Sequence, residues 1–78
     1  MPDKMEVGAR IKALRTNSGM TQEELANSLG ISRQAVCNYE TGDCIPSDRI
    51  KMKMAAIFGA SVQSIFFADN VNKMATNP

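Results

Sequence analysis

The sequence predicts an all-α protein of five short helices, folded as one small domain. Apolar residues recur at helical spacing in successive stretches, whereas no stretch alternates convincingly between apolar and polar residues as a half-buried strand does. Four of these stretches are followed by glycine, which readily takes the left-handed conformation that ends a helix. With 78 residues, the chain has room for one domain. We expect that domain to span residues 1–69 and residues 70–78 to form a flexible tail.

The first helix is predicted from Met5 to Ser18, with Gly19 directly after it. Its apolar face is formed by Met5, Val7, Gly8, Ile11 and Leu14. Basic residues take the other faces (Arg10, Lys12 and Arg15), so the sequence predicts an amphipathic helix.

Two shorter helices follow, each preceded by a capping residue. Thr21 precedes the second helix, and Glu24 three residues later completes a capping box. Gly30 ends this helix, and Ser32 caps a third that runs from Arg33 to about Thr41. We expect the inner side of the third helix to consist of Ala35, Val36 and Tyr39.

Ser47 and Ser61 cap the last two predicted helices, and Gly59 ends the first of them. Their apolar residues predict a core that contains Met54, Phe58, Ile65 and Phe66. Phe67 points in another direction because Phe66 takes the inward one. We predict that Phe67 contacts a second copy of the chain, and packing beneath the tail is the alternative.

The two helices around Gly30 form a helix-turn-helix arrangement over about residues 21–41. Two short helices joined by three to four residues, with an apolar residue after the glycine, are typical of this motif. Ala26 is small enough for the next helix to cross closely, and Ile31 fills the angle between the two helices. Gly30 can take the positive φ that so sharp a turn needs.

Polar residues occupy the outward face of the third helix. Val36 faces the core, which leaves an outward set of Arg33, Gln34, Cys37 and Asn38. Arginine forms two hydrogen bonds with guanine, and glutamine or asparagine does so with adenine. An exposed set of this kind at a helix N-terminus is what reading of bases in the major groove requires.

Several stretches of the chain resemble a known family. They are Gly8–Arg15 (GARIKALR), Gly19–Ala26 (GMTQEELA), Leu29–Val36 (LGISRQAV), Tyr39–Gly42 (YETG) and Pro46. In this order they are similar to the phage-repressor/Cro-like (XRE) helix-turn-helix family over about residues 6–67. The resemblance implies a compact lambda-repressor-like domain that binds double-stranded operator DNA as a homodimer and regulates transcription, usually by repression. Ile45–Phe67 is most similar to small regulators of Gram-positive bacteria and their prophages.

The resemblance also implies roles for individual side chains in DNA binding. The base-reading positions of the family match Arg33, Gln34 and Asn38. Gln22 and Ser32 match positions that contact DNA phosphates.

Two further regions affect how many contacts to the DNA phosphates we expect. In the fourth helix, the basic residues either extend the phosphate contacts or form only a solvated face (Arg49, Lys51 and Lys53). Of these, Arg49 is favoured as a phosphate contact because it lies near the helix start. After Gly42 the family often carries lysine or arginine, whereas this chain has Asp43 and Cys44, which weakens the expected contact beyond the turn.

Arg15 and Glu40 match an ion pair of the family, buried or half-buried, that locks the first helix to the third. The alternative is a pair of solvated charges, which contributes only about 0–1 kcal/mol to stability.

The composition argues against catalysis and against a metal site. The chain has no histidine, which is the commonest general base and the commonest metal ligand. Cys37 and Cys44 alone cannot complete a four-ligand zinc site within one chain. We expect a protein that is not an enzyme and has no cofactor, and no small-molecule ligand is evident. A redox switch at Cys37 is the alternative to a small residue tolerated near the DNA surface.

The apolar runs of the sequence are short. The longest has about four or five residues, against the roughly 20 that span a bilayer. The N-terminus has no apolar stretch typical of a signal peptide. We therefore expect a cytoplasmic protein with no membrane contact.

The net charge of +1 is the feature that fits DNA binding least. It leaves open another function, a protein-interaction module with the same fold, such as an antitoxin or an anti-repressor partner. The polar outward face favours DNA, because a protein-binding face would favour aromatic and apolar residues. Within residues 21–41, Arg33 stands against three glutamates, which have roles at a helix start or in an ion pair. We therefore expect binding that depends on helix ends and side-chain amides, with weak non-specific affinity.

Overall fold

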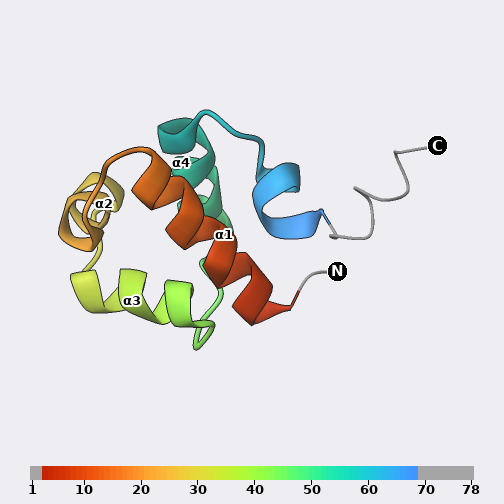
Figure 1. The fold of residues 1–78 in the computed structure, drawn as a ribbon, viewed down its shortest axis with the longest axis horizontal. Helices are drawn as coiled ribbons and strands as arrows, with labels where there is room; N and C mark the ends of the chain where they lie inside the picture. The colour runs from red at the N-terminus through yellow and green to blue at the C-terminus, as the bar shows by residue number, and fades with distance from the viewer. Residues whose placement is uncertain (1–2, 69–78) are drawn as a thin grey trace.

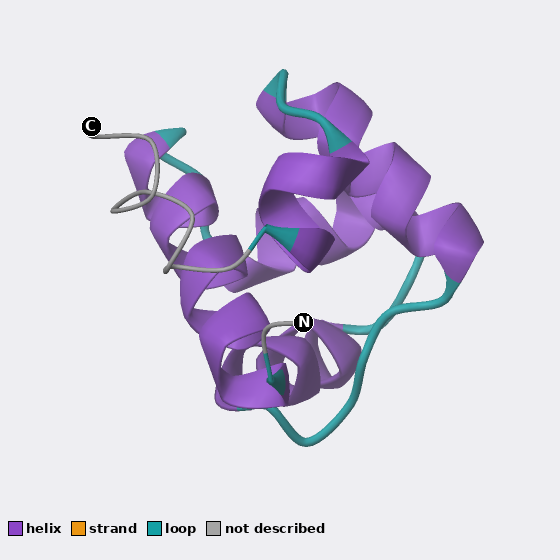
Figure 2. Cartoon of the chain, turned by 90° about the vertical axis from the view of Figure 1, so that its right-hand side faces the viewer, coloured by secondary structure: helices purple, strands orange, loops and turns teal. Residues whose placement is uncertain are grey.

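The structure is a computed structural model that describes residues 3–68. Its helices are α1 (Lys4–Asn17), α2 (Gln22–Leu29), α3 (Arg33–Thr41), α4 (Asp48–Phe58) and a π-helical turn, η1 (Gln63–Phe67). Residues 3–68 contain no strand, so the predicted all-α class with five helices is confirmed (Figure 2). The predicted tail, residues 70–78, lies outside the described residues.

Helix α1 runs through the middle of the molecule, and α3 and η1 pack directly against it. Figure 1 shows α2 and α3 on one side of α1 and η1 on the other. Helix α3 packs against α1 and α2, and α2 also packs against α4. All five elements contribute to the core, whose fully buried side chains are Ile11, Leu25, Leu29, Val36, Met54 and Ile65.

The start of α1 lies directly against the end of α3, backbone to backbone. A Cβ atom at Gly8 would lie 2.5 Å from the carbonyl oxygens of both Tyr39 and Glu40. Only glycine permits this approach, and it brings the last turn of α3 beside the second turn of α1. The side chain of Glu40 is thereby carried into the space between α1 and the start of α2.

Capping interactions determine where α2 and α3 begin. The Thr21 hydroxyl accepts from the Glu24 N–H at 3.0 Å, and the Glu24 carboxylate accepts from the Thr21 N–H at 2.8 Å. The Ser32 hydroxyl accepts from the N–H of Ala35 at 3.1 Å. Gly30 has a φ of +72°, so the left-handed turn between the two helices is present as predicted.

Three details of the sequence prediction are wrong or need adjustment. Met5 is 72% exposed, because it lies two residues from buried Val7 and thus on nearly the opposite side of the helix. Phe58 is half-buried and packs against the edge of the core rather than within it. The last helix is a single π-helical turn, in which the Ala68 N–H donates to the Gln63 carbonyl at 2.9 Å.

Candidate nucleic-acid interface

The predicted base-reading residues lie on the first two turns of α3. Arg33 and Gln34 are exposed, and Asn38 is half-buried one turn further on. The Gln34 side-chain amide nitrogen donates to the side-chain oxygen of Asn38, Oδ1, at 3.0 Å. This bond holds the two amides together as a unit, and it leaves the carbonyl oxygen of Gln34 and the amide nitrogen of Asn38 able to bind further groups. Cys37, predicted to point outward, is half-buried.

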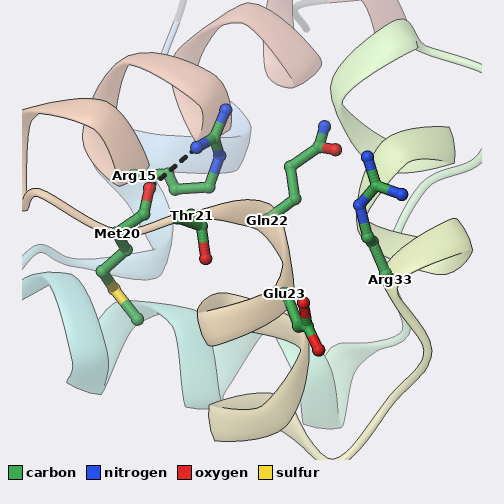
Figure 3. A pocket seen from close by; sticks show the side chains of 6 residues that line it. All are labelled: Arg15, Met20, Thr21, Gln22, Glu23 and Arg33. Atoms are coloured by element: carbon green, nitrogen blue, oxygen red, sulfur yellow. Dashed lines mark hydrogen bonds between the residues drawn. The ribbon is translucent and has the colours of Figure 1, made fainter.

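A pocket separates the start of α2 from the start of α3 (Figure 3). Its lining consists of Arg15, Met20, Thr21, Gln22, Glu23 and Arg33. Figure 3 shows the Gln22 amide and the Arg33 guanidinium pointing to the same side, with the Glu23 carboxylate turned the other way. The pocket therefore places a neutral donor and a cation beside the N-terminus of α2, whose dipole favours an anion.

An ion pair connects α1 to the end of α3 behind this pocket. Arg15 Nε lies 2.6 Å from Glu40 Oε2, and Nη2 donates to Oε1 at 3.3 Å. The side chains are 11% and 3% exposed, so the structure brings Arg15 and Glu40 together as a buried pair rather than as two solvated charges. Arg15 Nη1 also donates to the Met20 carbonyl at 2.8 Å.

The amide of Gln22 is engaged with the same carboxylate. Gln22 Nε2 donates to Glu40 Oε1 at 3.1 Å, and the Gln22 side chain is half-buried. No sequence pattern indicates this bond, because the two residues are 18 positions apart and meet through the packing of α2 against α3. The family resemblance indicates Gln22 as a phosphate contact, but not its bond to Glu40.

The structure distinguishes Arg49 from the other two basic residues of α4. Arg49 is exposed in the first turn of α4. Lys53 Nζ donates to the carbonyl of Leu29 at 3.4 Å, at the C-terminus of α2. Lys51 Nζ lies 3.9 Å from Asp48 Oδ1 and 5.0 Å from the centre of the Phe67 ring. Of the three, only Arg49 has a side chain that is clear of such contacts among the described residues.

Ser32 is exposed at the start of α3, where its hydroxyl oxygen caps the helix. A serine hydroxyl that accepts one hydrogen bond still has its own hydrogen to donate. Ser32 is therefore able to cap α3 and donate to an oxygen outside the protein at the same time.

Phe67 is half-buried and lines an apolar groove at the other end of α1 from the pocket. The other groove residues are Asp3, Lys4, Val7, Ile45, Lys51 and Phe66. Ile45, which lies in the loop between α3 and α4, is 41% exposed there. The groove gives Phe67 apolar neighbours without covering it.

Neither cysteine forms a disulfide, and residues 3–68 contain no group of three His, Cys, Asp or Glu side chains that could hold a metal ion. The pKa of the Tyr39 hydroxyl is raised above its ordinary value of 10.0, first by burial and then by the negative charge of a nearby Cys44 thiolate. None of the helices within residues 3–68 has the length and hydropathy needed to cross a bilayer.

The helix-turn-helix family model matches residues 11–65, which is most of the chain. The chain belongs to the phage-repressor/Cro-like (XRE) helix-turn-helix family. An HTH-type transcriptional regulator of Archaeoglobus fulgidus is 39% identical over 61 residues, which cover 78% of this chain and 87% of the relative. The HTH-type regulator YgzD of Bacillus subtilis is 32% identical over 63 residues, which cover 81% of this chain and 96% of the relative.

Among solved structures, the restriction-modification controller protein C.AhdI of Aeromonas hydrophila has a similar fold. It superposes with a TM-score of 0.73 at 31% identity, and the match covers 80% of this chain and 94% of that one. These similarities confirm the predicted family, including its likeness to regulators of Gram-positive bacteria, and they extend it to an archaeal regulator. The protein is thus an XRE-type helix-turn-helix transcriptional regulator.

Proposed function

We propose that this XRE-type regulator is a repressor that binds a roughly palindromic operator as a homodimer, with α3 in the major groove. The observation that carries the proposal is the exposure of Arg33 and Gln34 on the first turn of α3, beside the open N-terminus of α2. In helix-turn-helix proteins the second helix of the motif, which is α3 here, contacts base edges with its N-terminal residues. Repression follows when the bound dimer occupies a promoter.

The base contacts come from Arg33, Gln34 and Asn38. The guanidinium of Arg33 suits O6 and N7 of guanine, and the linked amides of Gln34 and Asn38 suit N6 and N7 of adenine. Because Gln34 donates to Asn38, the two amides move together, and we expect their contributions to base recognition to be coupled.

Neutral donors provide most of the phosphate contacts. Gln22 lies at the positive end of the α2 dipole, and Ser32 has a hydroxyl hydrogen free to donate. Arg49 supplies a cation from the first turn of α4. This combination fits a chain whose net charge is only +1.

The homodimer brings two α3 helices to successive major-groove faces, about 34 Å apart. Phe67 and the apolar groove around it support this part of the proposal, because a half-buried aromatic side chain in an apolar groove is suited to an interface. Two identical subunits related by a two-fold axis require an operator with matching symmetry.

The test begins by selecting bound duplexes from a random-sequence pool with the purified protein. The double variant Arg33→Ala/Gln34→Ala is expected to lose about 100-fold or more in affinity for the selected duplex, since each good base contact contributes about 1–3 kcal/mol. Lys12→Ala, which removes an exposed cation from α1, is the matched control and keeps full affinity.

Circular dichroism verifies that the helices remain in the double variant. Equal affinity of the wild type and this variant for the selected duplex contradicts the assignment of the reading face. If no duplex is enriched and binding to DNA does not respond to salt, the fold serves a protein partner instead of DNA.

A further inference from the structure

We infer that Glu40 is a positioning residue for DNA binding, because its buried carboxylate holds the amide of Gln22 in the orientation that donates to a phosphate. The inference rests on the proposed function and adds a residue that is too buried to touch DNA itself. The side chain of Glu40 is only 3% exposed, and it lies behind the pocket from which Gln22 and Arg33 emerge.

The carboxylate determines which end of the Gln22 amide faces inward. A carboxylate only accepts hydrogen bonds, so the amide nitrogen faces Glu40 and the amide oxygen cannot take its place. The nitrogen carries two hydrogens, and the bond to Glu40 uses one of them. The other is left to donate to an oxygen of the DNA backbone. A freely rotating amide would also present its oxygen, which a phosphate repels.

Arg15 makes this arrangement compatible with a nearby phosphate. Its guanidinium binds both oxygens of Glu40, at 2.6 Å and 3.3 Å, and thereby offsets the negative charge. The same group donates to the carbonyl of Met20 at 2.8 Å. The chain on either side of Thr21 is therefore attached to one ion pair, by Met20 before the cap and by Gln22 after it.

Glu40 thus joins three helices at the point where α2 begins. Arg15 comes from α1, Gln22 from α2 and Glu40 from α3, so the position of the phosphate donor on α2 is tied to the reading helix itself. In a purely structural role, the ion pair would affect DNA binding only through folding. In the positioning role, the contribution of Gln22 depends on Glu40.

A double-mutant cycle separates the two roles. Gln22→Ala, Glu40→Gln and the double variant are compared for affinity to the selected duplex, under conditions where each is folded. Gln22→Ala is expected to weaken binding about fivefold or more in the wild type, because a hydrogen bond to a charged group is lost. In the Glu40→Gln background the same change is expected to weaken binding less than about twofold.

Arg15→Lys is the matched control for the ion pair. It perturbs the bidentate bond and the bond to Met20, but it leaves a cation beside Glu40 and leaves the Gln22 bond in place. We expect Gln22→Ala to keep its full effect in this background. Equal effects of Gln22→Ala in all three backgrounds would overturn the inference while leaving the proposed function intact.

An NMR measurement on the folded wild type does not depend on the stability of any variant. The side-chain amide of Gln22 is expected to be rigid and shifted downfield before DNA is added, in contrast to the exposed amide of Gln63. Motional averaging of Gln22 like that of Gln63 also overturns the inference. Failure to bind any DNA would refute the proposed function, and the NMR signal of Gln22 would then report separately on whether Glu40 holds the amide.

Discussion

At the residue scale, Gly8 is the position where tertiary packing most clearly opposes local preference. Alanine normally stabilises a helix interior by about 1 kcal/mol relative to glycine. At this site a Cβ would lie 2.5 Å from two backbone carbonyl oxygens of α3, which cannot rotate away as a side chain can. We expect Gly8→Ala to lower the free energy of unfolding by about 2 kcal/mol, as urea denaturation would measure.

Ala9, the next residue on α1, provides the control for this prediction. It is exposed, so Ala9→Gly should cost only the propensity difference of about 1 kcal/mol. A Gly8→Ala variant more stable than the wild type would mean that α1 and α3 lie further apart than described.

Tyr39 offers a second prediction at this scale, because it is the only tyrosine and the chain has no tryptophan. Burial, followed by the charge of Cys44, raises its pKa above 10.0 in the folded protein. The unfolded chain therefore releases the tyrosine proton first as the pH rises through about 10, and folding stability falls there. Absorbance of the phenolate should show a midpoint above 10.0 in buffer and an ordinary one in urea. Cys44→Ser should lower the folded midpoint, and identical midpoints in buffer and urea would refute the shift.

At the element scale, the positions of the helices could be predicted from local signals, whereas their contacts could not. Thr21, Ser32 and Ser47 are capping residues whose effect is confined to the next few residues, and α2, α3 and α4 begin where these residues stand. The exposure of Met5 was missed because it depends on which side of α1 the rest of the protein covers.

The candidate site illustrates the same limit. The sequence predicts Arg33 and Gln34 as outward-facing residues of α3, because the inward direction of Val36 follows from helical periodicity alone. The bond between Gln22 and Glu40 depends on how α2 packs against α3, which joins residues 18 positions apart in the chain. Long-range packing of this kind has no signature in a single sequence.

Helix α2 carries an acidic residue, Glu23, that we expect to oppose the proposed approach of DNA. Glu23 is exposed on the lining of the pocket, turned away from Gln22 and Arg33, and its charge is favoured by the helix dipole. Replacing Glu23 by Gln removes the repulsion between its carboxylate and a DNA phosphate in each protomer. For an assumed separation of about 8 Å in water, DNA affinity should therefore rise about two- to fivefold. The same change should lower stability by about 0.3–1 kcal/mol. Filter binding and urea denaturation measure the two effects, and Glu23→Asp, which keeps the charge, should leave affinity unchanged. A loss of affinity in Glu23→Gln would contradict the proposed approach of DNA to α2.

At the scale of the whole molecule, the groove around Phe67 allows a test of the proposed homodimer. Phe67→Ser should weaken dimerisation about tenfold or more, since an aromatic side chain buried at an interface commonly contributes 2 kcal/mol or more. Met52→Ser is the control, because Met52 is a 67% exposed apolar residue that does not line the groove. Sedimentation equilibrium measures the dimerisation constant of each. Equal constants for the wild type and Phe67→Ser would place Phe67 outside the interface.

The small net charge of +1 also leads to a prediction about the whole complex. Binding through neutral donors releases few counterions, and each phosphate that a cation neutralises contributes about −0.9 to the slope of log K against log salt concentration. We expect a slope of only about −2 to −4 for the dimer, because Arg49 is the main cation placed to contact phosphates. Arg49→Gln should make the slope shallower by about 2, one phosphate being lost from each protomer.

Lys53→Gln removes a cation from the same helix, but Lys53 is already engaged with the Leu29 carbonyl. We therefore expect it to leave the slope unchanged, and salt titration of both variants on the selected duplex measures the difference. Equal slopes for Arg49→Gln and the wild type would remove Arg49 from the DNA contacts. A slope near −8 in the wild type would show that a broader basic surface binds DNA. The neutral donors at the starts of α2 and α3 would then not account for most of the contacts to the DNA phosphates.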